Sequence, residues 1–127
     1  MSDRILPNPP ITPESAPFFE AAKQGRFLIR RCGSCGKAHW YPRALCPFCF
    51  GETAWEEASG DGTIYSYSVM RRTSPPYAIG YVTLAEGPTM MTNLVDCDFD
   101  SLAIGQDVSL VFKASADGTP IPCFRPS

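Results

Sequence analysis

The sequence predicts a mainly β protein in which an N-terminal helix and a four-cysteine metal ribbon precede a small, closed barrel of five strands. Three observations lead to this prediction. Two Cys-x-x-Cys pairs stand ten residues apart within the segment 32–49. Hydrophobic side chains follow a period of two, not 3.6, from residue 62 onward, which is typical of strands. Thirteen prolines and ten glycines favour short strands and turns over a helical bundle.

A helix is predicted over residues 15–24, after a proline-rich start that we expect to be extended. Ser15 can cap its first turn, Pro17 is tolerated there, and Gly25 can end it. Its apolar face consists of Phe18, Phe19 and Ala22. We expect this face to cover the core, with a ligand or partner surface as the alternative. Residues 27–29 are then predicted to form a short strand that leads into the first cysteine.

Four cysteines form two knuckles of the kind that hold a metal ion. They are Cys32, Cys35, Cys46 and Cys49. Each knuckle can present two thiolates on one side of a tight turn, which Gly33 and Gly36 are expected to permit in the first knuckle. Zinc is the predicted metal, with iron as a substitute, because ligation by four sulfurs suits both. Four sulfur ligands leave no open coordination position, so we expect the metal to be structural.

Other roles of the cysteines are weaker predictions. A thioredoxin-like redox centre expects one Cys-x-x-Cys motif in a βαβ context. A rubredoxin-like electron carrier would be coloured when it holds iron. Cys97 and Cys123 are expected to be buried small hydrophobic residues or inert surface residues. His39, the only histidine, is not counted as a ligand because four cysteines already complete the tetrahedron.

The remaining residues predict a small barrel with Greek-key topology. Its predicted strands are 65–69, 79–84, 90–95, 108–112 and 120–125. A helical turn is expected near 101–104, between the third and fourth strands. The last strand contains prolines, which cannot donate to a central ladder, so it is predicted to lie at an edge.

The charges divide the chain near residue 50. Residues 1–50 hold seven basic and three acidic residues, a net +4, whereas residues 51–127 hold four basic and ten acidic residues, a net −6. Together with the cysteine spacing, this shift predicts an arm and docking helix over 1–31, a ribbon over 32–58 and a barrel over 59–127. The overall charge of −2, and the acidic barrel half in particular, argue against a basic nucleic-acid groove.

The sequence shows neither a membrane segment nor an assembled active site. No apolar run approaches the roughly 20 residues of a membrane helix, and the first residues lack the apolar stretch of a signal peptide. We therefore expect a cytoplasmic protein, in which reduced cysteines favour metal binding over disulfides. There is no glycine-rich dinucleotide motif and no P-loop. Asp96, Asp98 and Asp100 lack the later glutamate of an EF-hand, so we expect a solvated loop face.

Several motifs beside the cysteine quartet carry a resemblance to a known family. They are the segment 18–32, Tyr41-Pro42-Arg43, Trp55, the segment 59–66, Tyr77, the segment 105–108 and Phe124-Arg125-Pro126. In this order they closely resemble the zinc-ribbon/OB-fold family of acyl-CoA-associated proteins, also called domain of unknown function family 35. The resemblance covers residues 12–126 and implies a rubredoxin-like zinc ribbon followed by a five-stranded OB-fold barrel. The chain carries Phe50 where many ribbons have a small residue, which is expected to alter a contact surface but not ligation.

This resemblance implies a non-catalytic accessory subunit rather than an enzyme in its own right. Similar proteins act beside thiolase-fold enzymes, namely thiolases, aldolases and acyltransferases, or beside hot-dog-fold enoyl-CoA hydratases. The implied partners are therefore such an enzyme and its acyl-CoA, without nucleic acid or membrane. The ribbon and helix are expected to dock the partner, while the barrel helps to hold the CoA thioester.

The three phosphate groups of CoA would require basic side chains. The candidates for CoA or partner binding are Arg30, Arg31, Arg43, Arg71 and Arg72, with Tyr65 and Tyr67 as aromatic neighbours. Trp40 and Tyr41 could also stack on an adenine or fill an interface. Arg71 and Arg72 lie in a predicted loop between the first two barrel strands, where barrel ligands often bind. The ordinary alternatives are salt bridges for the arginines and core packing for the tyrosines.

Two other function classes stay open as alternatives. A nucleic-acid-binding module would use the same ribbon and barrel, and steeply salt-dependent binding to a single strand would favour it. A self-sufficient enzyme would rely on Cys97, Cys123 or His39, and turnover of an acyl-CoA by the isolated chain would favour it.

Overall fold

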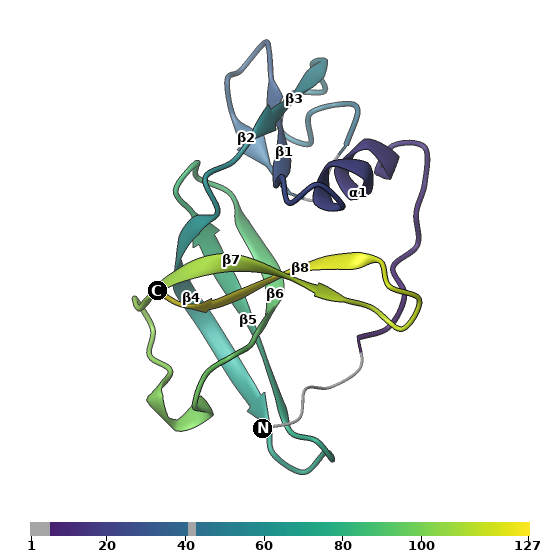
Figure 1. Cartoon of the computed structure of the whole chain (residues 1–127). Helices are drawn as coiled ribbons and strands as arrows, with labels where there is room; N and C mark the ends of the chain where they lie inside the picture. Colours follow the sequence, from purple (N-terminus) through teal and green to yellow (C-terminus); the bar gives the residue numbers. More distant parts are fainter. Residues whose placement is uncertain (1–5, 41–42) are drawn as a thin grey trace.

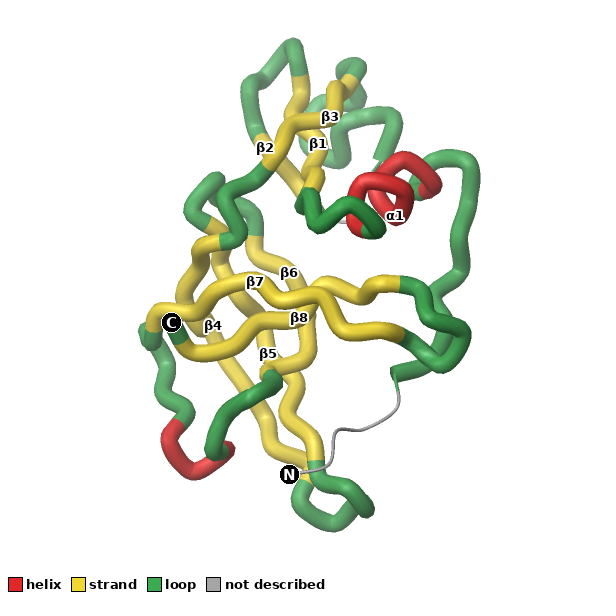
Figure 2. The backbone as a smooth tube through the Cα atoms, viewed as in Figure 1, coloured by secondary structure: helices red, strands yellow, loops and turns green. Residues whose placement is uncertain are grey.

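The computed structural model describes residues 6–40 and 43–127, which form a three-stranded sheet with a helix above a five-stranded barrel (Figure 1). In chain order the elements are α1 (Ala16–Ala22), β1 (Leu28–Cys32), β2 (Ala38–His39), β3 (Thr53–Glu57), β4 (Asp61–Met70), β5 (Tyr77–Leu84), β6 (Thr89–Leu94), the 3-10 turn η1 (Phe99–Ser101), β7 (Asp107–Ala114) and β8 (Pro120–Pro126). Strands dominate the chain (Figure 2), which confirms the predicted mainly β class.

The smaller sheet is the ribbon, with strand order β2-β1-β3. β1 pairs antiparallel with both neighbours, and its last residue, Cys32, lies opposite Thr53 of β3. The predicted strand 27–29 therefore ends too early, because pairing with β3 continues it to Cys32. An isolated antiparallel bridge between Leu45 and Glu52 closes the second knuckle next to the same end of the sheet.

α1 begins one residue later and ends two residues earlier than predicted. Ser15 precedes the helix, but its side chain does not cap it. Instead, Ser15 Oγ accepts a hydrogen bond from Thr12 N at 3.0 Å, so the hydroxyl stabilises the turn before the helix. Pro17 lies in the first turn as predicted, and Gly25 follows the helix with a φ of +78°. The buried face consists of Phe18, Phe19, Ala21 and Ala22.

An aromatic cluster connects the helix, the ribbon and the barrel. The ring of Phe18 makes edge contacts with Phe27 and Trp40, at centroid distances of 6.0 and 5.0 Å. Phe27 in turn lies 6.4 Å from Phe124 of β8. The buried residues of α1, β1 and the barrel belong to one hydrophobic cluster. The expected role of the helix as a cover of the core is therefore confirmed.

The larger sheet is a closed barrel with strand order β4-β5-β6-β8-β7. The predicted edge position of the last strand is wrong: β8 pairs antiparallel with β7, and it pairs parallel with β6 at Leu94 and Phe124. Phe124 O accepts a hydrogen bond from Val95 N, so the peptide groups of Phe124 and of alternate residues before it point toward β6. Two of these alternate residues are prolines. Pro120 and Pro122 lack an N–H only toward β6, and the ladder to β7 stays complete.

The helical turn between β6 and β7 spans Phe99–Ser101 instead of the predicted 101–104. Asp98 determines where it begins. Its side chain accepts from Asp100 N at 3.0 Å, and its carbonyl accepts from Ser101 N at 2.9 Å. The acidic loop after β6 is therefore a capped turn.

The proline-rich start lies along the barrel and is attached to the turn between β7 and β8 (Figure 1). Leu6 is buried and forms a parallel bridge with Ser115, and Ala116 N donates to Leu6 O at 3.0 Å. Asn8 Oδ1 accepts from Asp117 N at 2.9 Å. Within the described ranges, no helix has the length and apolarity needed to cross a bilayer.

Candidate metal centre and partner surface

The two knuckles bring four thiols into one cluster. The Sγ atoms of Cys32, Cys35, Cys46 and Cys49 all lie within 4.8 Å of one another. Cys32 Sγ lies 3.5 Å from Cys49 Sγ, and Cys35 Sγ lies 3.7 Å from Cys46 Sγ. A zinc–sulfur bond of about 2.3 Å gives a tetrahedron with edges of about 3.8 Å. The cluster therefore fits a metal ion held by four thiolates.

Backbone amides favour the thiolate form that metal binding needs. The N–H groups of Cys35 and Ser34 donate to Cys32 Sγ, each at 3.3 Å, and they lower the pKa of this thiol to about 6. The Gly51 amide favours the thiolate of Cys49, but the neighbouring thiols outweigh it and raise the pKa of Cys49 to about 11. A bound cation would remove the mutual repulsion of the thiolates, because it neutralises their negative charge.

The second knuckle fits against the first because residue 51 has no side chain. A Cβ atom at Gly51 would lie 2.8 Å from Ser34 Oγ and 3.1 Å from Cys32 Sγ. Both distances are too short for ordinary van der Waals contact, so a larger residue would push the knuckles apart. Of the two glycines singled out in the sequence, Gly36 has a φ of +76°, whereas Gly33 does not have a positive φ.

His39 lies outside the four-sulfur cluster. Its side chain is 3% exposed on β2, and neither ring nitrogen has a hydrogen-bond partner among the residues that the structure describes. Burial lowers the pKa of this imidazole, which keeps it neutral at pH 7. The side chain is thus placed as a packed part of the ribbon.

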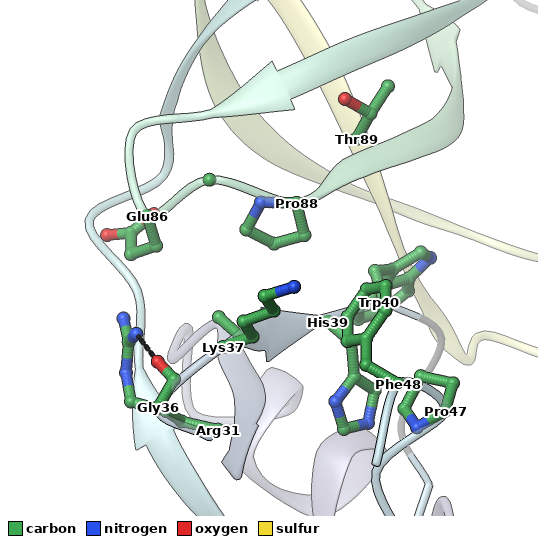
Figure 3. A pocket seen from close by; sticks show the side chains of 12 residues that line it. Arg31, Gly36, Lys37, His39, Trp40, Pro47, Phe48, Glu86, Pro88 and Thr89 are labelled. Carbon is green, nitrogen blue, oxygen red and sulfur yellow. Dashed lines mark hydrogen bonds between the residues drawn. The ribbon is translucent and has the colours of Figure 1, made fainter.

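A cavity of about 520 Å³ lies between the ribbon and the barrel (Figure 3). Lys37, Trp40 and Phe48 line its ribbon side, while Glu86 and Thr89 line its barrel side at the turn between β5 and β6. Lys37 Nζ lies 5.0 Å from the centre of the Phe48 ring and points into the cavity (Figure 3). In the described part of the chain, Lys37 forms no ion pair.

Glu86 joins this cavity to the linker between ribbon and barrel. Its Oε2 accepts from Ser59 N at 2.9 Å, while its Oε1 is buried without a partner among the described residues. Sequence reasoning singled out neither Glu86 nor Lys37. No motif marks them, since the cavity forms where the segments 36–48 and 86–89 meet in space.

The candidate arginines of β1 are engaged by neighbouring residues of β3. Arg30 Nε donates to Thr53 Oγ1 at 2.7 Å, and its guanidinium lies 4.6 Å from the centre of the Trp55 ring. Arg31 forms a salt bridge with Glu56 at 3.0 Å. The Glu56 hydrogen bond raises the pKa of Arg31. These two arginines therefore have structural partners within the ribbon.

The other three candidate arginines are exposed. Arg71 forms a salt bridge with Asp100 at 2.6 Å, whereas no ion pair of Arg43 or Arg72 occurs within the described ranges. Arg71 and Arg72 lie in the turn between β4 and β5, as predicted, at the end of the barrel away from the ribbon (Figure 1). The structure thus separates the five arginines into a ribbon group and a barrel-turn group.

The aromatic candidates are also dispersed. Tyr65 and Tyr67 both lie on β4, where Tyr65 is 67% exposed. Tyr67 donates its hydroxyl to Leu102 O at 2.9 Å, which ties β4 to the segment after η1. Trp40 lines the cavity between ribbon and barrel. Tyr41 lies outside the described residues.

The remaining thiols are at least partly buried, and two of the acidic loop residues form ion pairs. Cys123 is fully buried, as expected, and Cys97 is half-buried. Burial raises the pKa of Cys97, which opposes a role as a nucleophile at neutral pH. Asp96 pairs with Lys113 at 2.8 Å, and Asp100 pairs with the turn between β4 and β5. The acidic loop is thus occupied by ion pairs and a turn cap.

Two family models match the chain and meet within β3, the last strand of the ribbon. The model for the ChsH2 rubredoxin-like zinc ribbon domain matches residues 19–56, and the model for the ChsH2 C-terminal OB-fold domain matches residues 55–113. A DUF35 domain-containing scaffold protein of Methanothermobacter thermautotrophicus is 37% identical over 91 residues, which cover 65% of this chain and 68% of that protein. The chain belongs to the DUF35 family. The resemblance inferred from the motifs and the predicted ribbon and barrel are thereby confirmed.

Solved structures show the same DUF35 architecture. A chain of the Ltp2-ChsH2(DUF35) aldolase superposes with a TM-score of 0.80 and 36% identity, covering 94% of this chain and 98% of that chain. A DUF35 protein of unknown function from Sulfolobus solfataricus, at 16% identity and a TM-score of 0.68, shows the fold alone and covers 91% of this chain and 86% of that chain.

A longer curated relative also contains this DUF35 region. The probable enoyl-CoA hydratase alpha subunit of Thermomonospora curvata is 38% identical over 130 residues. The match covers 97% of this chain but 40% of that protein, so the chain spans less than half of that relative's length.

Proposed function

We propose that this DUF35 chain is a non-catalytic accessory subunit of an enzyme complex that processes an acyl-CoA. One observation carries the proposal: the chain is 36% identical, over 94% of its length, to a chain of the Ltp2-ChsH2(DUF35) aldolase. Homologues from two methanogens, which are named scaffold proteins, support a role in assembly rather than in chemistry.

The proposed partner is a thiolase-fold enzyme, of the thiolase, aldolase or acyltransferase type, or a hot-dog-fold hydratase. The aldolase complex supports the first choice, and the relative named as a hydratase subunit supports the second. The partner would supply the nucleophile or base. In this chain His39 is buried, Cys123 is fully buried, and the raised pKa of Cys97 disfavours its thiolate.

The proposed metal is zinc, with iron as a substitute, held by the four knuckle cysteines in a closed and therefore structural site. We also propose the division into an arm and docking helix (1–31), a ribbon (32–58) and a barrel (59–127). A cytoplasmic location belongs to the same proposal. It is supported by the four cysteines that cluster as metal ligands, since thiols used for metal binding are typical of a reducing compartment.

The chain is proposed to help hold the acyl-CoA at the entrance to the partner enzyme's active site. Arg71 and Arg72 are the favoured phosphate contacts because both are exposed and adjacent in one turn. The salt bridge of Arg71 with Asp100 is itself exposed, so a phosphate can replace it. Replacing both by glutamine should weaken acyl-CoA or partner binding, whereas Arg125→Gln, a matched change of an exposed arginine on β8, should not. Equal affinities of the two variants would exclude the turn from the binding site.

Affinity purification of the tagged protein from its native cells, followed by native mass spectrometry, tests the proposal. We expect a stoichiometric complex with a thiolase-fold or hydratase-fold enzyme, with one zinc ion for each copy of this chain. Recovery of nucleic acid with a lone chain would contradict it and favour a nucleic-acid-binding module. Turnover of an acyl-CoA by the partner-free chain would contradict its non-catalytic part.

A further inference from the structure

The barrel is weakly closed between β6 and β8. These two strands pair at Leu94 and Phe124, and no further register position joins them. One side-chain bond continues the contact, from Thr92 Oγ1 to Pro122 O at 3.0 Å. Toward the start of β6, Pro120 and Pro122 offer no N–H to that strand, so its edge is left without a ladder on this side.

The unpaired backbone groups of β6 can be identified from the alternation of its hydrogen bonds. Leu84 N donates to Pro88 O at the start of the β5–β6 pair. Because hydrogen-bonded pairs alternate along an antiparallel ladder, the peptide groups of Thr89 and Met91 point away from β5. Val95 follows the same alternation and donates its N–H to Phe124 O at 2.9 Å. Among the described strands, none pairs with Thr89 or Met91 on that side.

A groove with a volume of about 500 Å³ runs along this edge. Its lining residues are Pro9, Phe18, Phe19, Trp40, Tyr81, Thr89–Asn93, Ile121 and Pro122, none of which is charged. An unpaired strand edge beside an apolar wall is the arrangement to which an extended peptide adds as a further strand. The backbone edge would supply hydrogen bonds, and the wall would supply side-chain contacts.

Exposed side chains extend the groove over the outer face of the barrel. Tyr81 and Met91 lie directly opposite each other on β5 and β6, and they are 47% and 61% exposed. Both also line a neighbouring hollow with Ser66 and Tyr67. Two large exposed side chains at one cross-strand position offer a contact for alternate side chains of an added segment.

The opposite end of the groove adjoins a lysine, Lys37, and a carboxylate, Glu86. Trp40 and Thr89 line both the groove and the cavity between ribbon and barrel, so the two hollows adjoin. Lys37 points into that cavity and has no ion pair among the described residues (Figure 3). Arg31 is held by Glu56 and by Gly36 O, which leaves Lys37 as the cation free to meet a ligand there. Glu86 Oε2 is held by Ser59 N and its Oε1 is buried, whereas Lys37 Nζ is directed into the cavity. An occupant that complements Lys37 is uncharged along β6 and negative near that lysine.

We propose that the groove receives an extended segment of the partner protein, which adds to β6 as a strand. This segment is apolar along Thr89–Met91 and carries a carboxylate at the end next to Lys37. The proposal rests on the accessory-subunit function, since it names the surface and the kind of segment through which a partner is held. A nucleic-acid strand would instead need cations along β6, where the lining has none.

Random decapeptides displayed on phage, selected on the full-length zinc-loaded protein, provide the probe. We expect enrichment of sequences that alternate apolar residues and have Asp or Glu near one end. In the unsubstituted protein, a synthetic copy of a selected peptide should slow hydrogen exchange of the Met91 amide at least tenfold. This readout needs no substitution in the chain.

Four variants then separate the contacts. Met91→Pro removes the outward N–H without removing a bond to β5, whereas Met91→Ala keeps that N–H and removes only the side chain. Lys37→Glu reverses the charge in the cavity, and Lys23→Glu makes the same change on a lysine that pairs with Glu20 at the end of α1. We expect Met91→Pro and Lys37→Glu to weaken binding of the selected peptide about tenfold or more. Met91→Ala, which loses one side-chain contact but keeps the N–H, should weaken it clearly less than Met91→Pro does, and Lys23→Glu should weaken it less than threefold.

Selection of no peptide, of basic peptides, or of peptides that bind Met91→Pro and Lys37→Glu unchanged would overturn the proposal. This test does not depend on identifying the partner enzyme. If the partner co-purifies but the peptide test fails, the groove is not a peptide-binding site and the accessory function is retained. If the peptide test succeeds but no acyl-CoA enzyme co-purifies, the groove binds peptides and the proposed function is wrong.

Discussion

Gly36 and Phe50 occupy equivalent positions in the two knuckles. Each follows the second cysteine of its pair, and their φ angles are +76° and +64°. Gly36 N donates to Cys32 O at 3.0 Å, and Phe50 N donates to Cys46 O at 2.8 Å. The knuckles are therefore two copies of one turn, and the second places a phenylalanine in the left-handed region that favours glycine.

Phe50→Gly should stabilise the metal-loaded protein. The left-handed backbone is unfavourable for an L-residue by about 1–2 kcal/mol, and the greater freedom of glycine in the unfolded chain offsets about 0.5–1 kcal/mol of the gain. The ring is 77% exposed, so little packing is lost. We expect a rise in melting temperature of about 3 °C, measured by circular dichroism.

Phe50→Ala is the matched control for this prediction. It removes the same ring but keeps a Cβ atom at a positive φ, so it should give no gain. Equal stabilisation by alanine and glycine would show that the ring, and not the backbone angle, limits stability.

Gly51→Ala should destabilise the ribbon and weaken metal binding. Its new Cβ atom would meet Ser34 Oγ at 2.8 Å and Cys32 Sγ at 3.1 Å, and overpacking of this kind destabilises by about 1–3 kcal/mol. Adding Ser34→Gly removes the collisions with the serine side chain, leaves the one with Cys32 Sγ, and should restore part of the loss. The measurement is the midpoint of a zinc-buffer titration, and a midpoint unchanged by Gly51→Ala would contradict the close approach.

Removal of the metal should unfold the ribbon. A short segment with three small strands has little core of its own, so metal binding supplies much of its folding free energy. Trp40 and Trp55, the two tryptophans of the chain, both lie in the ribbon region, so their fluorescence reports on it selectively. We expect a chelator to shift this emission to longer wavelength and added zinc to reverse the shift. An unshifted spectrum from verified metal-free protein would refute the prediction.

Asp117 should make the attachment of the N-terminal arm sensitive to acid. The hydroxyls of Ser115 and Thr119 donate to its carboxylate at 2.6 and 2.7 Å, and they lower its pKa below the ordinary 3.8. Since the folded-state pKa is the lower one, this stabilisation is present above about pH 3.8 and is lost as the pH falls through the folded value. In the same turn, Asp117 N donates a hydrogen bond to Asn8 Oδ1, which attaches the arm.

Asp117→Asn should therefore lower the urea midpoint at pH 7 and have a smaller effect well below pH 3.8, where the aspartate is protonated. Glu20→Gln, a change of an exposed carboxylate on α1, is the control for a general charge effect. A difference between Asp117→Asn and the unsubstituted protein that stays constant from pH 7 to low pH would show that the carboxylate charge is not involved.

Local patterns predicted the elements that depend on nearby residues. The cysteine spacing predicted the clustered thiols because each knuckle is a turn of a few residues, and alternation predicted the barrel strands because side chains of a strand point to opposite faces. The errors lie where distant residues compete. Ser15 bonds to Thr12 instead of capping α1, and pairing with β3 lengthens β1.

The position of β8 shows what a local rule omits. Proline was taken as a sign of an edge, because it cannot donate to a ladder. In the structure the prolines face β6, and the antiparallel ladder to β7 is formed by the other residues of the strand. A proline prevents hydrogen bonding on only one side of its strand. Which neighbouring strand lies on that side depends on how the barrel closes.

The four clustered thiols and the mainly β class could be predicted from the sequence, because they depend on residue type and short spacing, and the DUF35 membership because its motifs recur in order along the chain. Which basic residues are engaged by neighbours follows only from the tertiary structure. It engages Arg30, Arg31 and Arg71 with neighbours, and it leaves Lys37 directed into a cavity. The groove along β6 likewise arises where α1, Trp40 and β8 meet. Pairing and cavities of this kind depend on residues far apart in the chain, and no local pattern encodes their distances.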